Sequence, residues 1–178
     1  MIKIRALPAL SACAALAATF AAGVASFSAE AGTSPQSSTF LVSLTVHDDC
    51  TISAGNALNF GTATSSLINT AINGTTTFTV TCTNTTLYHM SLDAGSTTGS
   101  TVTNRLLLGG ATGATVPYQL YTDNTYTAVW GDSTGGSIID GHGTGQAQTI
   151  TVNGKALSTG SMPAPDTYTS TETVTITF

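Results

Sequence analysis

Apolar and polar residues alternate along several short stretches of the chain, and such alternation is typical of β-strands with one buried face. In the clearest stretch, residues 75–83, Phe78, Val80 and Cys82 share one face while threonines occupy the other. No stretch combines helical spacing of its apolar residues with capping residues at its ends. The pattern predicts strands over residues 39–47, 58–62, 75–83, 87–93, 105–108, 116–122, 127–130, 149–152 and 167–178.

Clusters of Gly, Ser, Thr and Asn separate these stretches and predict turns or loops, for example over residues 141–145. Asn153-Gly154 is a dipeptide that favours a two-residue hairpin turn. Short strands joined by such turns are typical of a β-sandwich, so the predicted fold class is all-β, in one domain.

The first 31 residues have the pattern of a secretory signal. Two basic residues lie in the first five positions, an uncharged Ala-rich run follows, and Ala29-Glu30-Ala31 fits the small-x-small cleavage pattern. A membrane anchor, a lipoprotein signal at Cys13 and cleavage after Ala25 are the alternatives. We therefore predict a signal peptide over residues 1–31 and an exported mature chain that begins at Gly32.

The composition excludes several classes of function. Only 7% of the residues are charged and the formal net charge is −5, so the chain lacks the basic patch that nucleic acids and anionic membranes require. Thr supplies about a fifth of the chain, and because Thr favours strands and carries no charge, it predicts a nearly neutral outer surface rich in hydroxyl groups. We expect no nucleic-acid partner.

Two cysteines, Cys50 and Cys82, remain after removal of the predicted signal. An even number of cysteines in an exported chain predicts a disulfide between them. A zinc site is a poor alternative, because the cysteines do not form a CxxC pair and the three histidines are scattered.

Candidate chemistry is sparse in the rest of the chain. His47, His89 and His142 stand in no recognisable catalytic motif, and Asp48-Asp49 lacks the spacing of a calcium loop. A glycoside hydrolase would need a convergent pair of acids, whereas the acids other than this pair lie singly in turns. We therefore expect no enzyme activity, cofactor, metal or small-molecule substrate.

Blocks along nearly the whole mature chain, about residues 40–178, carry a resemblance to a known family. They are Cys50-Thr51-Ile52 with Val46 before it, Leu58-Asn59-Phe60-Gly61, Val80-Thr81-Cys82, Val116-Pro117-Tyr118-Gln119-Leu120-Tyr121-Thr122-Asp123, Val129-Trp130-Gly131, and Tyr168-Thr169-Ser170-Thr171 with Val174-Thr175-Ile176-Thr177-Phe178. They resemble the spore coat protein U domain family, which includes the subunits of archaic (Csu-like) chaperone–usher pili. The chain departs from the family pattern at Thr167, where a glycine is usual, and at Ser170, where an acid is usual.

The resemblance implies an incomplete immunoglobulin-like β-sandwich that is completed by donor-strand exchange with the N-terminal strand of the next subunit. Residues 32–38 show no apolar alternation, so donation is expected from residues 39–46. The expected organisation is a flexible leader and donor strand over 32–47, followed by a sandwich domain over 48–178. The alternative is that this strand belongs to its own domain, or serves in both. The expected donor side chains are Phe40, Val42, Leu44 and Val46.

The resemblance also implies partners: like subunits in a homopolymer, a periplasmic chaperone and an outer-membrane usher. Val174, Ile176 and Phe178 alternate up to the last residue, so this strand is expected to line the open groove and to be held by the chaperone. The expected function is a structural pilin subunit of a surface fibre, exported through the periplasm, for adhesion and biofilm formation. A spore or cell coat protein of the same fold and a secreted carbohydrate-binding sandwich are the alternatives.

Overall fold

The computed structural model describes residues 32, 35–53, 55–64 and 69–178, so the predicted signal peptide lies outside the described residues. In the described part all regular secondary structure is β, which confirms the predicted fold class, and no helix there could cross a membrane. The strands are β1 (Cys50–Ile52), β2 (Ile72–Cys82), β3 (Leu87–Leu92), β4 (Arg105–Gly109), β5 (Thr115–Tyr121), β6 (Ile139–His142), β7 (Ala147–Ala156), β8 (Tyr168–Thr169) and β9 (Val174–Thr177).

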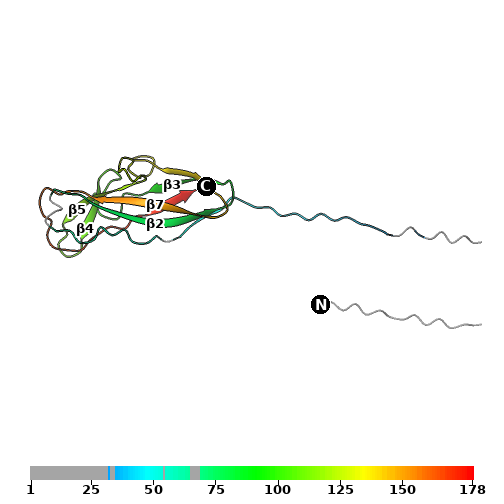
Figure 1. The fold of residues 1–178 in the computed structure, drawn as a ribbon, viewed down its shortest axis with the longest axis horizontal. Helices are drawn as coiled ribbons and strands as arrows, with labels where there is room; N and C mark the ends of the chain where they lie inside the picture. The colour runs from blue at the N-terminus through cyan, green and yellow to red at the C-terminus, as the bar shows by residue number, and fades with distance from the viewer. Residues whose placement is uncertain (1–31, 33–34, 54, 65–68) are drawn as a thin grey trace, which may run out of the picture. The chain divides into compact units, whose positions relative to one another are not determined.

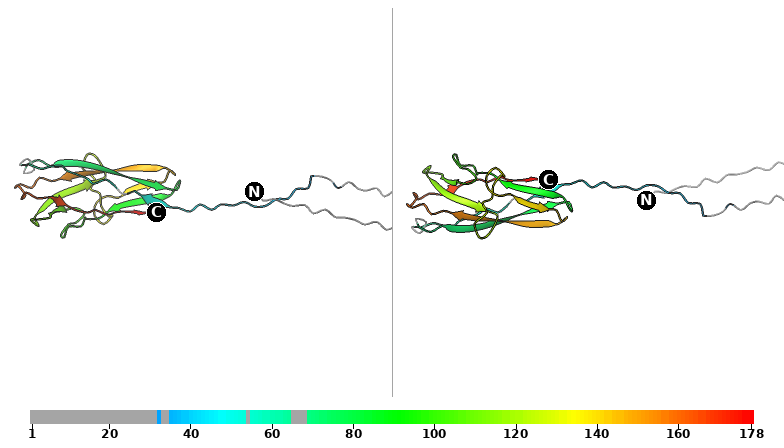
Figure 2. Two further views of the ribbon diagram at one scale, coloured as in Figure 1. Left: turned by 90° about the horizontal axis from the view of Figure 1, so that it is seen from below. Right: turned by 90° about the horizontal axis from the view of Figure 1, so that it is seen from above.

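The strands form two antiparallel sheets that lie face to face (Figures 1 and 2). The larger sheet has the order β1-β2-β7-β5-β4-β8, and the smaller has the order β6-β3-β9. Consecutive strands β2 and β3 belong to different sheets, so the chain crosses between the layers after Cys82. β1 is an edge strand of the larger sheet, and β9 is an edge strand of the smaller one.

The core lies between the sheets and follows the alternation of the sequence. Phe78 and Val80 of β2 point inward against Met90 of β3, and all three are buried. Trp130 is fully buried, stacks on Phe78 with ring centroids 6.0 Å apart, and donates a hydrogen bond from Nε1 to the main-chain oxygen of Met90 at 3.1 Å. The indole thus links the inner faces of both sheets.

Threonines cover the outer face of the larger sheet, as the composition predicts. Thr77 of β2 lies directly opposite Thr151 of β7, and Thr79 lies opposite Thr149. Cross-strand pairs of this kind favour the sheet through side-chain contact. The face therefore presents uncharged hydroxyl groups to solvent.

The prediction of a hairpin turn at Asn153-Gly154 is wrong, because both residues lie inside β7. Gly154 is directly opposite Gly74 of β2, and both glycines face the interior. A Cβ on Gly154 would lie 2.7 Å from Cδ1 of Leu58, and one on Gly74 would lie 3.2 Å from the ring of Phe60. The glycine is required here for close approach of another segment rather than for a turn.

Other local predictions also differ from the structure. Residues 127–130 form only isolated bridges, and the predicted strand 167–178 is divided into β8 and β9, which belong to different sheets. Residues 58–62 form no strand, because Leu58 and Phe60 instead lie across the glycine pair on the inner face of the sheet. The stretch 141–145 begins inside β6, so only its later part is a loop. Residues 39–47 carry no strand in the single chain, although their alternation predicts one.

Candidate functional site

A groove with a volume of about 640 Å³ opens between the two sheets. One wall runs from the end of β1 through residues 55–60, and the other is the segment that leads into β9, residues 170–174. The floor consists of inward-facing core side chains, so most of the groove surface is apolar. The floor residues are Phe78, Leu92, Leu107, Tyr118, Leu120 and Val152.

Each wall of the groove contains an unpaired sheet edge. β1 pairs with β2 alone and β9 pairs with β3 alone, among the strands of the described chain. An edge strand leaves a row of main-chain N–H and C=O groups without ladder partners. The groove therefore combines apolar side chains on its floor with the outer edges of β1 and β9, which lack a ladder partner among the described strands. An added β-strand would need both features.

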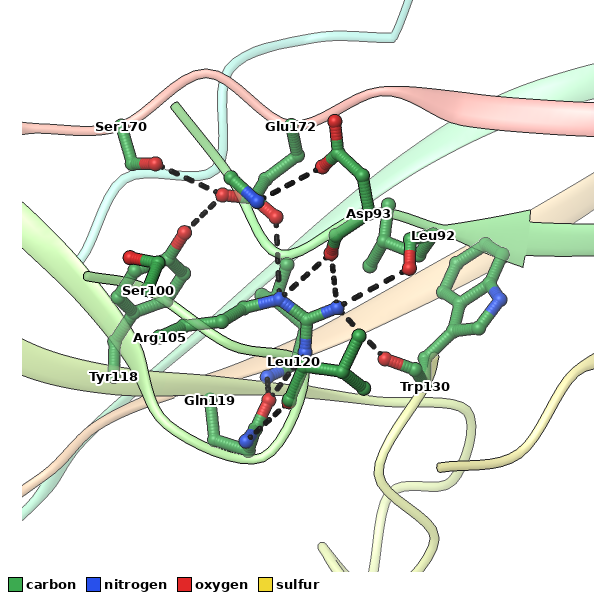
Figure 3. A network of polar contacts seen from close by, with 12 residues as sticks. Leu92, Asp93, Ser100, Arg105, Tyr118, Gln119, Leu120, Trp130, Ser170 and Glu172 are labelled. Atoms are coloured by element: carbon green, nitrogen blue, oxygen red, sulfur yellow. Dashed lines mark hydrogen bonds and ion pairs between the residues drawn. The ribbon is translucent and has the colours of Figure 1, made fainter. Parts of the chain in front are cut away.

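Glu172 places a carboxylate in the wall that leads into β9. Its Oε2 lies 3.2 Å from Nε of Arg105, whose side chain has no exposed surface. Its Oε1 accepts hydrogen bonds from Ser170 Oγ at 2.9 Å and from the hydroxyl of Tyr118 (Figure 3). Burial, and then the hydrogen bond to Glu172, raise the pKa of Tyr118 well above its usual range, so the phenol stays protonated as a donor.

The remaining nitrogens of Arg105 are bonded to the main chain and to Gln119. Nη1 donates to Oε1 of Gln119 at 2.5 Å and to the Val102 oxygen at 2.9 Å, and Nη2 donates to the Asp93 and Trp130 oxygens at 2.5 and 2.9 Å. A buried guanidinium is tolerated only when its donors are satisfied in this way. Arg105 therefore ties β4, β5 and the loop after β3 to the wall of the groove (Figure 3).

A second cavity of about 520 Å³ lies at the end of the sandwich where β2 begins and β7 ends. It shares Phe60 and Leu107 with the first groove, and its exposed rim includes Met162. The two cavities are therefore adjacent, with Phe60 between them.

Of the C-terminal residues predicted to form the groove, Val174 lines the cavity directly. Ile176 is half-buried against the core opposite Met90, and Phe178 is 53% exposed beyond the last strand residue. The threonines between them face outward, as the alternation requires. The structure thus brings Val174 and Ile176 to the inner side of β9.

The N-terminal apolar segment, residues 39–46, is exposed throughout, and all described residues from 35 to 49 lie outside regular strands. Five exposed large apolar side chains within seven residues are unusual for a monomeric protein. The large apolar side chains of this segment are 71–90% exposed: Phe40, Leu41, Val42, Leu44 and Val46.

The predicted disulfide is confirmed. Cys50 at the start of β1 is bonded to Cys82 at the end of β2, and the two residues face each other in the strand register. The disulfide therefore fixes the edge strand β1 beside the groove.

The structure places the candidate polar residues apart from the groove. His89 and Asp140 form an exposed pair at 2.6 Å on the outer face of the smaller sheet. In the described residues, no group of three or more His, Cys, Asp or Glu side chains is arranged to hold a metal ion.

The sequence of the chain matches a known protein family. The model of the Spore Coat Protein U domain matches residues 36–177, which is most of the chain. The chain belongs to the Spore Coat Protein U domain family. The match includes the N-terminal apolar segment, both walls of the groove and β9.

A solved structure has a similar fold. It is described as the "CsuC-CsuE chaperone-tip adhesion subunit pre-assembly complex from archaic chaperone-usher Csu pili of Acinetobacter baumannii". The similarity has a TM-score of 0.56 at 19% sequence identity, and covers 75% of this chain and 41% of that chain. This chain therefore spans less than half the length of the chain it matches. No curated protein sequence gives a significant match.

The sequence pattern does not predict the polar end of the groove. It predicts a short apolar strand over residues 105–108, and Ser170 stands where the family resemblance leads us to expect an acid. In the structure the nearby carboxylate is supplied by Glu172, which Ser170 contacts. The available signal was Arg105 itself, because an arginine within an apolar strand of a chain with so few charges requires a buried partner.

Proposed function

We propose that this Spore Coat Protein U domain chain is a structural subunit of a chaperone–usher surface fibre, and that its copies polymerise by donor-strand complementation. The proposal rests on one observation. The chain has an apolar groove with two unpaired edges, and it also has an exposed apolar segment that alternates like a strand but pairs with none of the described strands. The occupant of the groove is then the segment 39–46 of a second copy.

The segment fits the groove in chemistry. A strand that inserts beside β9 gains ladder hydrogen bonds and points every second side chain at the floor. Burying Phe40, Val42, Leu44 and Val46 contributes about 6–12 kcal/mol gross. The net gain is smaller, because the segment loses conformational freedom on binding.

The topology supports one direction of insertion. Cys50 pairs with Cys82 at the end of β2, and Thr177 pairs with His89 near the start of β3, so the chain leaves the domain at the end where β9 stops. If the donor strand runs antiparallel to β9, the donor's domain lies at the end of the acceptor opposite to the one where the acceptor's own N-terminal segment departs. Each added copy then extends a linear fibre. A parallel donor would bring both domains to one end, where the acceptor's own N-terminal segment departs.

Export and assembly would require partners before the neighbour arrives, because a bare edge of this kind promotes aggregation. We assign the temporary protection to a periplasmic chaperone that holds the C-terminal strand, Val174 to Phe178, and the exchange to an outer-membrane usher. The similarity to a chain from a chaperone–subunit complex supports this assignment. The product would be a fibre outside the cell, with adhesion and biofilm formation as its roles.

The proposed role is structural rather than catalytic, and that of a stalk subunit, because the chain carries both an acceptor groove and an exposed apolar segment that a neighbour can accept. A coat layer built by the same strand exchange is the alternative within the family. Electron microscopy of producing cells separates the two, because a stalk subunit gives thin fibres and a coat subunit gives a layer.

A peptide competition experiment tests the groove directly. The mature Val42→Asp chain keeps its groove but carries a charge in its own donor segment. A synthetic peptide of residues 38–48 should raise its unfolding temperature in a saturable manner, whereas the same peptide with Leu44→Asp should not. Equal responses to the two peptides would count against the groove as a strand acceptor.

A further inference from the structure

The chain is held tightly just before it enters β1. Oδ1 of Asp48 accepts a hydrogen bond from Oγ1 of Thr86 at 2.8 Å. The main chain of Asp49 is bonded to Thr83 twice: its N–H donates to Oγ1 at 3.1 Å, and its oxygen accepts from the Thr83 N–H at 2.9 Å. Residues 48 and 49 are therefore attached to the turn that joins β2 to β3.

That turn is itself fixed to its surroundings. Thr86 is 3% exposed, and its hydroxyl lies 2.5 Å from that of Thr83. Gly143 donates its N–H to the Thr86 oxygen at 2.7 Å and accepts from the Thr85 N–H at 2.8 Å. A Cβ on Gly143 would lie 2.0 Å from the Thr83 oxygen, so the turn and the loop after β6 are in close contact. Asp48 is thus bonded to a turn that is itself hydrogen-bonded to the loop after β6.

We propose that Asp48 and Thr86 are positioning residues for strand donation, which hold the chain to its own domain up to residue 48 and leave His47 as the hinge. This inference rests on the proposed function, because the hinge acts only when residues 39–46 lie in a neighbour's groove. Val46 is then fixed by the acceptor and Asp48 by the donor's own domain. Two residues of extended chain span only about 7 Å, so neighbouring domains are held close and at a restricted angle.

The role is positional because the domain does not need this bond to remain folded. Asp48 is exposed, and removing its carboxylate leaves the Thr86 hydroxyl bonded to Thr83. The contacts of Asp49 to the turn are made by its main chain, so Asp49→Ala removes the same charge without removing them. Asp49→Ala is therefore the matched control for Asp48→Ala.

The first test measures backbone order by ¹⁵N relaxation in the monomeric Val42→Asp chain. We expect Asp49 and Asp48 to be as ordered as β2, with a sharp fall at His47. In Asp48→Ala and Thr86→Val the fall should move to Asp48, because Asp49 keeps its main-chain bonds to Thr83. Asp48→Asn, which keeps the acceptor oxygen, and Asp49→Ala should keep the original profile. Disorder that already includes Asp48 in the parent chain, or unchanged profiles in Asp48→Ala and Thr86→Val, overturns the inference.

The second test measures the bending of fibres by electron microscopy, in chains without the Val42 substitution. Asp48→Ala and Thr86→Val should form fibres in normal yield but with a persistence length shortened severalfold, and Asp49→Ala should match the wild type. Fibres of equal stiffness overturn the positioning role and leave strand donation intact. If the wild-type chain forms no fibres under any condition, the proposed function fails. The relaxation profiles still decide whether Asp48 and Thr86 hold the chain to its own domain up to residue 48.

Discussion

Nε of Arg105 lies 3.2 Å from Oε2 of Glu172, so a fully buried cation in β4 is neutralised by a carboxylate in the wall of the groove. A buried charge without a partner is costly, and this pair therefore links the integrity of the core to the position of the wall. The segment before β9 is held in place by the core even when no strand occupies the groove.

Replacing Glu172 with Gln should be strongly destabilising. The substitution keeps the shape of the side chain but leaves the Arg105 guanidinium without a countercharge, which costs roughly 3–5 kcal/mol when one partner of a buried pair is lost. Urea unfolding of the two chains measures the difference. Asp140→Asn removes an acid from an exposed pair and should change stability by only about 0.5 kcal/mol or less. Similar losses in both variants would refute the special role of the buried pair.

Removing the disulfide should weaken the fold and the groove together. Replacing Cys50 and Cys82 by Ala frees the edge strand β1, and loss of a native disulfide typically costs about 2–5 kcal/mol. Unfolding by urea measures the loss, and intact mass after alkylation under denaturing conditions checks the pairing in the parent chain. Uptake of alkylating reagent by an unreduced, correctly exported chain would show that the cysteines are free.

Gly154→Val should disturb the groove wall through a direct steric effect. The new side chain would meet Cδ1 of Leu58 and the ring of Phe60, and overpacking of this kind typically costs about 1–3 kcal/mol. We expect lower stability and weaker binding of the 38–48 peptide. Gly110→Ala is the control, because nothing lies within 4 Å of a Cβ at that position. An unchanged affinity for the peptide would mean that Leu58 and Phe60 do not shape the groove.

Stability should fall in acid partly through Asp166. Hydrogen bonds from Thr112, Thr167 and Ala111 lower the pKa of this carboxyl to about 2, below its usual value near 3.9. Because the folded-state pKa is the lower one, the contribution is complete above about pH 4 and is lost as the pH falls towards 2. The difference in unfolding temperature between wild type and Asp166→Asn should therefore shrink over this interval. A difference that stays constant from pH 6 to pH 2 would contradict the assignment.

Alternation was enough to predict the sandwich and much of its core. Residues 75–83 lie within β2 and residues 174–177 form β9, both with the expected faces inward, because a half-buried strand needs only a period of two. The rest of the predicted strand 167–178 is not part of β9, since residues 168–169 form β8 in the other sheet. The turn at Asn153-Gly154 was wrong because local preference cannot reveal that Leu58, far away in the sequence, occupies the space of the missing side chain. Close approach between distant segments is a tertiary property.

The sequence does not predict the polar end of the groove either, and the reason is again that distant segments meet there. Arg105 and Glu172 are 67 residues apart, and most partners of the guanidinium are main-chain oxygens, which leave no side-chain pattern. The hydrogen bond between Asp48 and Thr86 is also not predictable from the sequence, since it depends on the fold of the turn around Thr86. In contrast, the alternation of residues 39–46 can be seen in the sequence, because it is a local pattern that does not depend on distant segments.

The most direct test of strand donation is the Val42→Asp variant, examined for both chaperone binding and fibre formation. A charge at this central position would be buried without a partner in the neighbour's groove, at a cost of several kcal/mol. Leu44→Asp should behave alike, whereas substitutions at Ser43 or Thr45 should be tolerated, because an inserted strand points them away from the floor. Mixed with wild-type subunits, the aspartate variants should end fibres rather than extend them.

Pull-down of the Val42→Asp chain with its chaperone, beside a fibre assay, gives the deciding measurement. We predict that chaperone binding is retained, because the variant's own groove is unchanged, and that the variant alone forms no fibres, because its donor segment carries the charge. If residues 39–46 were instead a strand of their own domain, the variant would lose chaperone binding together with fibre formation. Joint loss would contradict strand donation by this segment.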